Sequence, residues 1–91
     1  MSQKRQKENK EKVTQAVATL QSVADSMTTP RNIRKIVKDV ITMLQDERLG
    51  VGVRAANAVS LLDETSQDPN MPSFARVTVW QALSALESVR E

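Results

Sequence analysis

The stretch Asp68-Pro69-Asn70-Met71-Pro72 decides how this chain folds, because it breaks the helical pattern between two helix-forming segments. Each proline disfavours the helical conformation of the residue before it, so Asp68 and Met71 are restricted to extended conformations. The Asp68 side chain is also suited to an Asx turn, in which it accepts a hydrogen bond from the following backbone. We therefore predict a rigid connection here, with one helix ending near residue 65 and the next beginning near Pro72.

Two further breaks lie upstream of this connection. Thr28-Thr29-Pro30 suits the start of a helix, with Thr29 as the N-cap and Pro30 at the first helical position. The segment 48–52 contains both glycines of the chain, and Gly50 suits the left-handed residue that follows the C-terminus of a helix. The three breaks together divide the chain into four segments.

Each of the four segments has apolar residues at spacings of three and four, the period of an amphipathic helix. The predicted inward positions are Val13, Ala16, Val17, Leu20, Val23, Ala24 and Met27; Ile33, Val37, Val40 and Leu44; Ala55, Ala58, Val59 and Leu62; and Ala75, Val79, Ala82, Leu83, Leu86 and Val89. Because the connections are short, antiparallel neighbours are expected. The predicted fold is an all-α, four-helix, up-and-down bundle in one domain of residues 13–91. A polar leader of residues 1–12 either extends the first helix or is disordered.

A helical solenoid is the competing architecture. Asp46, followed by Val53-Arg54 and Ala58, resembles the second-helix pattern of HEAT repeats. A solenoid needs about three or more units to bury its faces, and the chain has room for fewer than two. The bundle is therefore the preferred prediction.

The composition excludes most kinds of chemistry. Among the 91 residues there is no cysteine and no histidine, which removes thiolate nucleophiles, disulfides, the commonest general base and the commonest metal ligand. Neither a glycine-rich phosphate loop nor a Ser-x-x-Lys motif at a helix start is present. We expect no enzyme activity, no cofactor and no small-molecule substrate. No apolar run has membrane-spanning length and no signal peptide is recognisable, so a cytoplasmic protein without membrane contact is expected.

Positive charge is concentrated in the leader. Residues 1–12 carry a net charge of +3, whereas residues 13–91 carry −1. The leader is therefore a candidate nucleic-acid-binding segment through Lys4, Arg5, Lys7, Lys10 and Lys12. Contacts with phosphates alone would give weak, salt-sensitive binding without sequence preference. The only aromatic residues are Phe74 and Trp80, so the core is expected to be aliphatic and no platform for stacking several bases exists.

Four arginines lie near predicted helix starts, where the helix dipole disfavours positive charge. They are Arg31, Arg34, Arg54 and Arg76. The favoured interpretation is that they form ion pairs with nearby acids, namely Asp46, Asp63, Glu64 and Asp68. The alternative is an anion-binding or partner site gathered at one end of the bundle. The acids around the third break do not have the spacing of a calcium loop, so capping and solvation are the favoured roles for them.

Val77 and Trp80 form a second, narrower apolar stripe on the last helix, well away from its core-facing side. The favoured interpretation is that Trp80 closes the seam with a neighbouring helix. In the alternative the stripe is exposed and binds another chain, because tryptophan is a favoured interface anchor; a homodimer is its leading version. The functional hypothesis is thus a non-enzymatic helical protein-interaction or small structural domain. Accessory, non-sequence-specific RNA binding through the leader is the second hypothesis.

Several groups of residues together resemble one family. They are Arg31-Asn32-Ile33-Arg34, Arg54-Ala55-Ala56 with Ala58, Leu62-Asp63-Glu64, Asp68-Pro69-Asn70-Met71-Pro72, Arg76, Trp80 and Leu86-Glu87. Over residues 13–90 the chain is similar to the uncharacterised, mainly archaeal protein family 0147, although Val77 stands where a threonine is expected. The resemblance implies a compact four-helix bundle of left-handed, bromodomain-like arrangement. It implies no activity and no functional residues.

Overall fold

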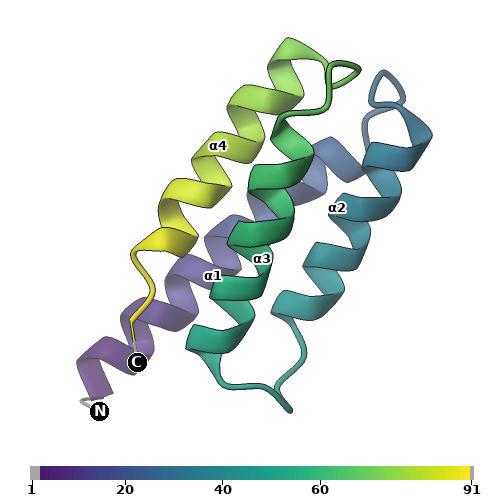
Figure 1. The fold of residues 1–91 in the computed structure, drawn as a ribbon. Helices are drawn as coiled ribbons and strands as arrows, with labels where there is room; N and C mark the ends of the chain where they lie inside the picture. The colour runs from purple at the N-terminus through teal and green to yellow at the C-terminus, as the bar shows by residue number, and fades with distance from the viewer. Residues whose placement is uncertain (1–2, 91) are drawn as a thin grey trace.

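The chain folds into four helices in the computed structural model, which describes residues 3–90 (Figure 1). They are α1 (Gln3–Ala24), α2 (Arg31–Leu44), α3 (Val51–Ser66) and α4 (Ser73–Glu87). No strand occurs in residues 3–90. Residues 1, 2 and 91, which belong to the predicted leader and to the end of the predicted bundle domain, lie outside the described residues.

The helices form an up-and-down bundle, as the sequence predicts. Consecutive helices pack against one another, and α4 closes the arrangement by packing against α1. The connections α1–α2 and α3–α4 lie at one end of the bundle and α2–α3 lies at the other (Figure 1). The molecule measures 41 × 22 × 19 Å. The bundle is therefore confirmed over the solenoid, while its left-handed, bromodomain-like arrangement stays a prediction.

The core is aliphatic, because both aromatic side chains lie at the surface. Its most deeply buried large members are Leu20, Ile33, Leu44, Leu62 and Leu86. One predicted core residue is wrong: Met27 is 83 % exposed. The reason is that α1 already ends at Ala24, so Met27 no longer follows the helical period and belongs to the turn.

All three connections are six residues long and have the same conformation. They comprise residues 25–30, 45–50 and 67–72. In each, the second residue is Ser26, Asp46 or Asp68, and its side chain accepts a hydrogen bond from the backbone N–H two residues later. Its carbonyl accepts another from the fifth residue of the turn. The predicted Asx turn at Asp68 is thus confirmed, and it is one of three equivalent turns.

Two predicted capping roles are wrong for the same reason. The sixth residue of each turn, Pro30, Gly50 or Pro72, has extended backbone and directly precedes the next helix. Gly50 therefore begins α3 with a φ of −62°, and does not end α2 in a left-handed conformation. Thr29 lies one position too early to cap α2, and its hydroxyl is buried without a hydrogen-bond partner among the described residues.

The leader belongs to the first helix. α1 is continuous from Gln3, and within it Asn9 is buried. The Asn9 amide donates to the carbonyl oxygen of Arg90, and its Oδ1 accepts from the Arg90 N–H at 3.3 Å. Lys12 adds a bond from Nζ to the carbonyl oxygen of Ser88 at 3.0 Å. The start of α1 thereby holds the segment that follows α4, so both ends of the chain lie at one end of the bundle (Figure 1).

Candidate interaction surface on α4

Three large apolar side chains are exposed on the outward side of α4, and two of them, Val77 and Trp80, are more exposed than Val53, which is 49 % exposed on α3. Ala75, Val79, Ala82 and Leu86 face the core with almost no exposed surface. The opposite side carries three exposed residues. The exposed fraction of the residue surface is 44 % for Phe74, 51 % for Val77 and 53 % for Trp80. We call these three residues, with the exposed polar Gln81 and Ser84, the α4 outer face.

The favoured sequence interpretation of Val77 and Trp80 is therefore wrong. Counting 100° per residue, Val77 is directed almost opposite to the centre of the core-facing side, and Trp80 lies within 60° of Val77. Neither direction points into a seam with α1 or α3. The two side chains stay at the surface, which satisfies the structural condition of the alternative interpretation.

The α4 outer face carries no charge. From Ser73 to Leu86 the only charged residue of the helix is Arg76. Its side chain turns away to the end of α3, where Nε donates to the carbonyl oxygen of Ser66 at 3.0 Å and Nη2 to that of Asp68 at 3.1 Å. What remains outward is a row of apolar and neutral polar groups about 15 Å long between Phe74 and Ser84.

Three of the four candidate arginines have a shared structural position. Arg34, Arg54 and Arg76 are each the fourth residue of a helix and each follows the Ser or Asp of the preceding turn by eight positions. Arg54 donates from Nη1 to the carbonyl oxygen of Leu44, the last residue of α2, at 2.7 Å. Arg76 donates in the same way to Ser66, the last residue of α3. Arg34 instead approaches the sulfur of Met27 at 3.8 Å.

The predicted ion pairs of these arginines are wrong. In residues 3–90, no ion pair joins Arg31, Arg34, Arg54 or Arg76 to any of the four predicted acids, Asp46, Asp63, Glu64 and Asp68. The helix termini supply the acceptors instead, because the last carbonyl groups of a helix have no intrahelical partner. The cluster is also divided in space: Arg54 lies at the α2–α3 end, whereas Arg34 and Arg76 lie at the opposite end.

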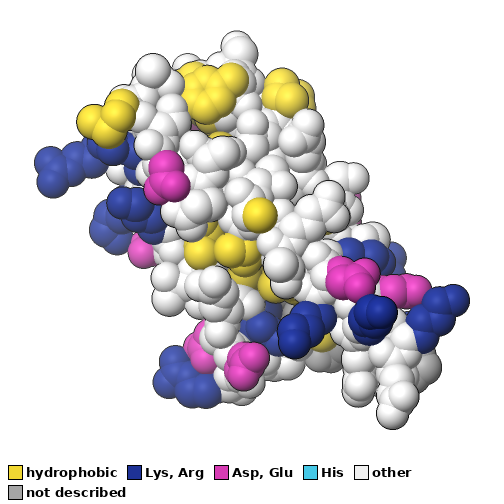
Figure 2. Space-filling model, turned by 180° about the vertical axis from the view of Figure 1, so that it is seen from behind, with side chains coloured by type: hydrophobic (Ala, Val, Ile, Leu, Met, Phe, Trp, Pro, Cys, Tyr) yellow, Lys and Arg dark blue, Asp and Glu magenta, His cyan; other side chains and the backbone are white. Residues whose placement is uncertain are grey.

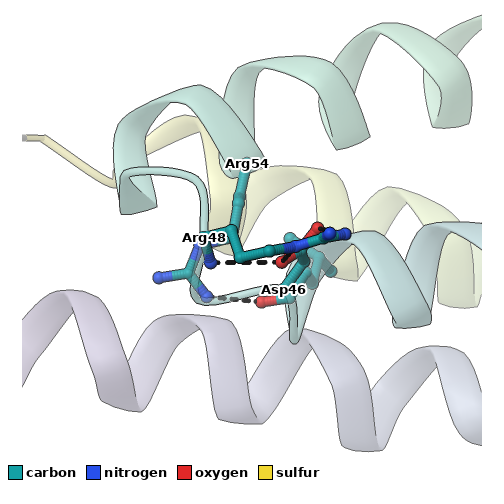
Figure 3. A network of polar contacts seen from close by, with 4 residues as sticks. Asp46, Arg48 and Arg54 are labelled. Atoms are coloured by element: carbon teal, nitrogen blue, oxygen red, sulfur yellow. Dashed lines mark hydrogen bonds and ion pairs between the residues drawn. The ribbon is translucent and has the colours of Figure 1, made fainter.

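Asp46, one of the acids predicted to pair with these arginines, is already paired with Arg48 in its own turn (Figure 3). Asp46 accepts from Arg48 Nε and Nη2, both at 2.9 Å, and from the Arg48 backbone N–H at 3.1 Å. These hydrogen bonds lower the pKa of the Asp46 carboxyl from 3.8 to about 2, with a smaller contribution from the charge of Arg54. Asp46 and Arg48 thus form a bidentate ion pair at the surface of the α2–α3 turn.

The cations of the leader do not form one face. Lys4, Arg5, Lys7 and Lys10 are exposed on α1, and by the helical period they point to several sides of it. Lys12 is half-buried because it contacts Ser88. The structure therefore brings these five residues onto one helix without gathering them into a groove.

A denser group of cations lies on α2. Arg31, Arg34, Lys35 and Lys38 point to one side of the helix and line a shallow hollow together with Asn32. Lys35 is paired with Asp39 at 3.1 Å. Figure 2 shows dark blue side chains along the edge formed by α2 and near the lower end, while apolar side chains gather toward the upper end. We call these four cations the α2 cationic face; only Arg31 and Arg34 of this face were candidate site residues from the sequence.

A second hollow of about 500 Å³ separates the first half of α1 from the α2–α3 turn. Val13, Val17, Leu44 and Val51 supply its apolar surface. Lys10, Glu47 and Arg54 stand around it with charges of both signs, so it favours neither anions nor cations. No group of three or more metal-ligating side chains occurs within residues 3–90, and none of the helices described there combines the length and apolar composition needed to cross a bilayer.

Comparison with known proteins places this bundle in a family. The profile of the uncharacterised protein family UPF0147 matches residues 1–89. The chain belongs to UPF0147. A UPF0147 protein of Metallosphaera sedula is 49 % identical over 84 residues, which cover 92 % of this chain and 94 % of that protein. One of Aeropyrum pernix is 45 % identical, with 92 % of each chain covered.

Solved structures agree with the fold. A crystal structure of a UPF0147 protein from Thermoplasma acidophilum has a TM-score of 0.85 and 27 % identity, and covers 92 % of this chain and 99 % of that one. The crystal structure of the unknown-function protein MMP1188 has a TM-score of 0.83 and 34 % identity, covering 88 % and 91 %. The family resemblance is thus confirmed, and neither the relatives nor these structures assign a function.

Sequence reasoning missed the shared role of the arginines. The signal is a repeat in which a Ser or Asp is followed four positions later by Pro or Gly. The same Ser or Asp is followed eight positions later by Arg. It occurs at 26–34, 46–54 and 68–76. Nearby acids are the obvious partners for these arginines in the sequence, but a guanidinium also satisfies the free carbonyl groups at a helix end.

Proposed function

We propose that this UPF0147 protein is a non-enzymatic interaction domain of the cytoplasm that binds another protein chain through the α4 outer face. The single observation that supports this most is the exposure of Phe74, Val77 and Trp80 on a helix side that carries no charge. Aromatic side chains are enriched and charges are depleted at the centres of protein interfaces. A binding function needs none of the histidine or cysteine chemistry that this sequence lacks.

The test is capture of partners from a native extract by tagged protein, read by mass spectrometry. The variant F74S/V77S/W80Q removes the α4 outer face, and R31Q/K35Q/K38Q is the matched control with three changes on the exposed side of α2. After nuclease treatment, we expect the wild type and the control to capture the same partner protein. We expect F74S/V77S/W80Q to capture at least tenfold less of it. Equal capture by the wild type and F74S/V77S/W80Q would contradict the proposal.

Nucleic-acid binding is the second candidate, and the α2 cationic face supports it better than the leader does. Arg31, Arg34, Lys35 and Lys38 share one side of a helix over two turns, a spacing that allows contacts with successive phosphates. Fluorescence anisotropy with a labelled single-stranded RNA at two salt concentrations tests it. Binding that R31Q/K35Q/K38Q weakens and K4Q/K7Q/K10Q leaves unchanged would support the α2 cationic face. No measurable binding by the wild type at low salt would exclude both segments.

A further inference from the structure

We propose that the hollow between the first half of α1 and the α2–α3 turn binds a small aliphatic carboxylic acid. The carboxylate is held by Arg54, and the aliphatic chain lies on the apolar floor of the hollow. The residues that line this site come from α1, the end of α2, the following turn and the start of α3. The site is therefore separate from the α4 outer face, and its failure would leave the proposed function unchanged.

The hollow follows one side of α1. The residues of α1 that line it are three or four positions apart, namely Gln6, Asn9, Lys10, Val13, Thr14 and Val17. From residue 6 to residue 17 this side measures about 16 Å. Positions 6, 9 and 10 are polar, so they supply no apolar side chain that would fill the space beside the α2–α3 turn. The volume of about 500 Å³ is typical of a small-molecule site.

The floor of the hollow is aliphatic. Leu44 and Val13 are buried, whereas Val17 and Val51 pack against the core and remain partly exposed. Figure 2 shows apolar side chains in the hollowed middle of this face, with charged side chains of both signs below them. An aliphatic chain that covers this floor removes apolar surface from water on both sides of the contact.

Arg54 supplies a donor that the chain does not use. Its side chain reaches from α3 toward the end of α2, where Nη1 donates to the carbonyl oxygen of Leu44 at 2.7 Å (Figure 3). Its Nε is buried and has no hydrogen-bond partner in residues 3–90. The Nε of Arg76, in the equivalent position of α4, donates to the carbonyl oxygen of Ser66. A buried donor without a partner is costly, so the Nε of Arg54 calls for an acceptor from outside the chain.

A carboxylate is the acceptor that fits this guanidinium. Its two oxygens accept from Nε and the adjacent Nη in a bidentate pair, which is stronger than a hydrogen bond between neutral groups. The chain's own Asp46 is held by Arg48. Lys10 and Glu47 are exposed and opposite in charge, whereas Arg54 is half-buried. One charged donor beside aliphatic surface therefore favours an acid over an alcohol with the same chain.

Arg34 shows that a buried donor alone does not make this site. Like Arg54, it is the fourth residue of its helix, and its Nε is buried without a partner in the described part of the chain. The hollow beside it is lined by Asn32 and by cations, among them Lys35 and Lys38. An aliphatic chain finds no aliphatic residue to cover there. R34Q is therefore the matched control for R54Q.

Titration of the ¹⁵N-labelled protein with octanoate, followed by NMR, tests the proposal. We expect saturable shifts of the backbone amides at residues 10–17 and 51–54, together with the Nε–H signal of Arg54. We expect octan-1-ol, which has the same chain and no carboxylate, to bind at least tenfold more weakly. No saturable shift at these residues with millimolar octanoate would overturn the proposal and leave water as the partner of Nε. Equal affinity for octanoate and octan-1-ol would overturn it as well.

Two variants act on the two parts of the site. R54Q removes the donor, and T14F places an aromatic ring over the floor from an exposed position that lines the hollow. We expect each to weaken octanoate binding at least tenfold. Q15F adds the same ring at the next exposed position of α1, outside the lining of the hollow. Q15F and R34Q should stay within about twofold of the wild type.

The variants also define the results that would contradict the site. Equal octanoate affinity of T14F and Q15F would overturn the placement of the ligand, and equal affinity of R54Q and R34Q would overturn the role of Arg54. Circular dichroism shows whether R54Q is folded. If it is not, the comparisons of T14F with Q15F and of octanoate with octan-1-ol decide.

Discussion

A single residue type, arginine, joins consecutive helices in this bundle. The guanidinium of Arg76 donates to the carbonyl group of Ser66 at the end of α3 and to that of Asp68 in the following turn, and the guanidinium of Arg54 donates to the carbonyl group of Leu44 at the end of α2. Because lysine lacks the rigid fork of donors of a guanidinium, we expect it to be a poor substitute at positions 54 and 76. Each of these arginines therefore positions the start of its own helix against the end of the previous one.

We predict that R76M destabilises the bundle by about 1.5–3 kcal/mol, because a charged donor is lost and the carbonyl oxygen of Ser66 at the end of α3 loses its hydrogen bond from Nε. Urea denaturation followed by circular dichroism measures this change. R31M is the matched control, since Arg31 is exposed at the first position of α2, and its effect should stay within about 0.5 kcal/mol. Equal effects of R76M and R31M would contradict the bridging role.

Thr29 offers the opposite test, in which a substitution stabilises. Its hydroxyl is buried without a hydrogen-bond partner in residues 3–90, and the equivalent position of the third turn holds the buried, apolar Met71. We predict that T29V, which keeps the shape and removes the hydroxyl, raises the free energy of unfolding by about 0.5–2 kcal/mol. Thermal denaturation provides the measurement. A lower melting temperature for T29V would show that the hydroxyl has a partner in solution.

Asp46 gives a pH dependence with a defined sign. Its pKa is lowered to about 2 in the folded protein, so the folded state favours the ionised carboxylate. This contribution to stability is complete above the unfolded value of about 4, and it is lost as the pH falls toward 2. We predict that D46N and R48Q each flatten the fall of the urea midpoint between pH 5 and pH 2. An acid profile of D46N parallel to that of the wild type would contradict this assignment.

At the scale of the elements, the turns determine where each helix begins. The prolines and Gly50 were recognised from the sequence as breaks, and the four helices follow from apolar spacings of three and four. The helix boundaries were less predictable, because α2 ends at Leu44, several residues before Gly50. A six-residue turn stabilised by its own backbone hydrogen bonds replaces the capping that the isolated residues Thr29 and Gly50 indicate.

The contact between α1 and the C-terminal segment was not predictable from helical periodicity. Asn9 lies in a stretch without apolar residues, and its importance depends on Arg90, which is 81 positions away. Hydrogen bonds to both backbone groups of Arg90 make the first turns of α1 part of the bundle. This explains how a polar leader can be helical without an apolar stripe of its own.

We predict that N9A destabilises the protein by about 1–3 kcal/mol, because the backbone groups of Arg90 lose their partners. Hydrogen exchange at residues 88–90 should become faster, while exchange in α2 changes only with global stability. N57A, at an exposed position of α3, is the control and should stay within about 0.5 kcal/mol. Unchanged exchange at residues 88–90 in N9A would contradict the role of this contact.

At the scale of the whole molecule, the sequence determined the bundle and left its surface ambiguous. Aliphatic spacing identifies which side of each helix is buried, because burial requires a continuous stripe. It does not decide whether a second stripe meets a neighbour, since that depends on how α1 and α3 are placed around α4. Val77 and Trp80 were assigned to a seam for this reason, and the closed bundle leaves them outside. The arginines were ambiguous in the same way, because their acceptors are backbone groups, and only the repeat of Ser or Asp, Pro or Gly, and Arg indicates their shared position.

The central claim is that the α4 outer face is not needed for folding and is therefore free for a partner. Equilibrium urea denaturation of F74S/V77S/W80Q, followed by circular dichroism at low micromolar concentration, tests it most directly. We predict a free energy of unfolding within about 1 kcal/mol of the wild type, because exposed side chains contribute little to stability. A loss of about 3 kcal/mol or more would contradict the claim, since a loss of this size would require the three side chains to be packed in the monomer.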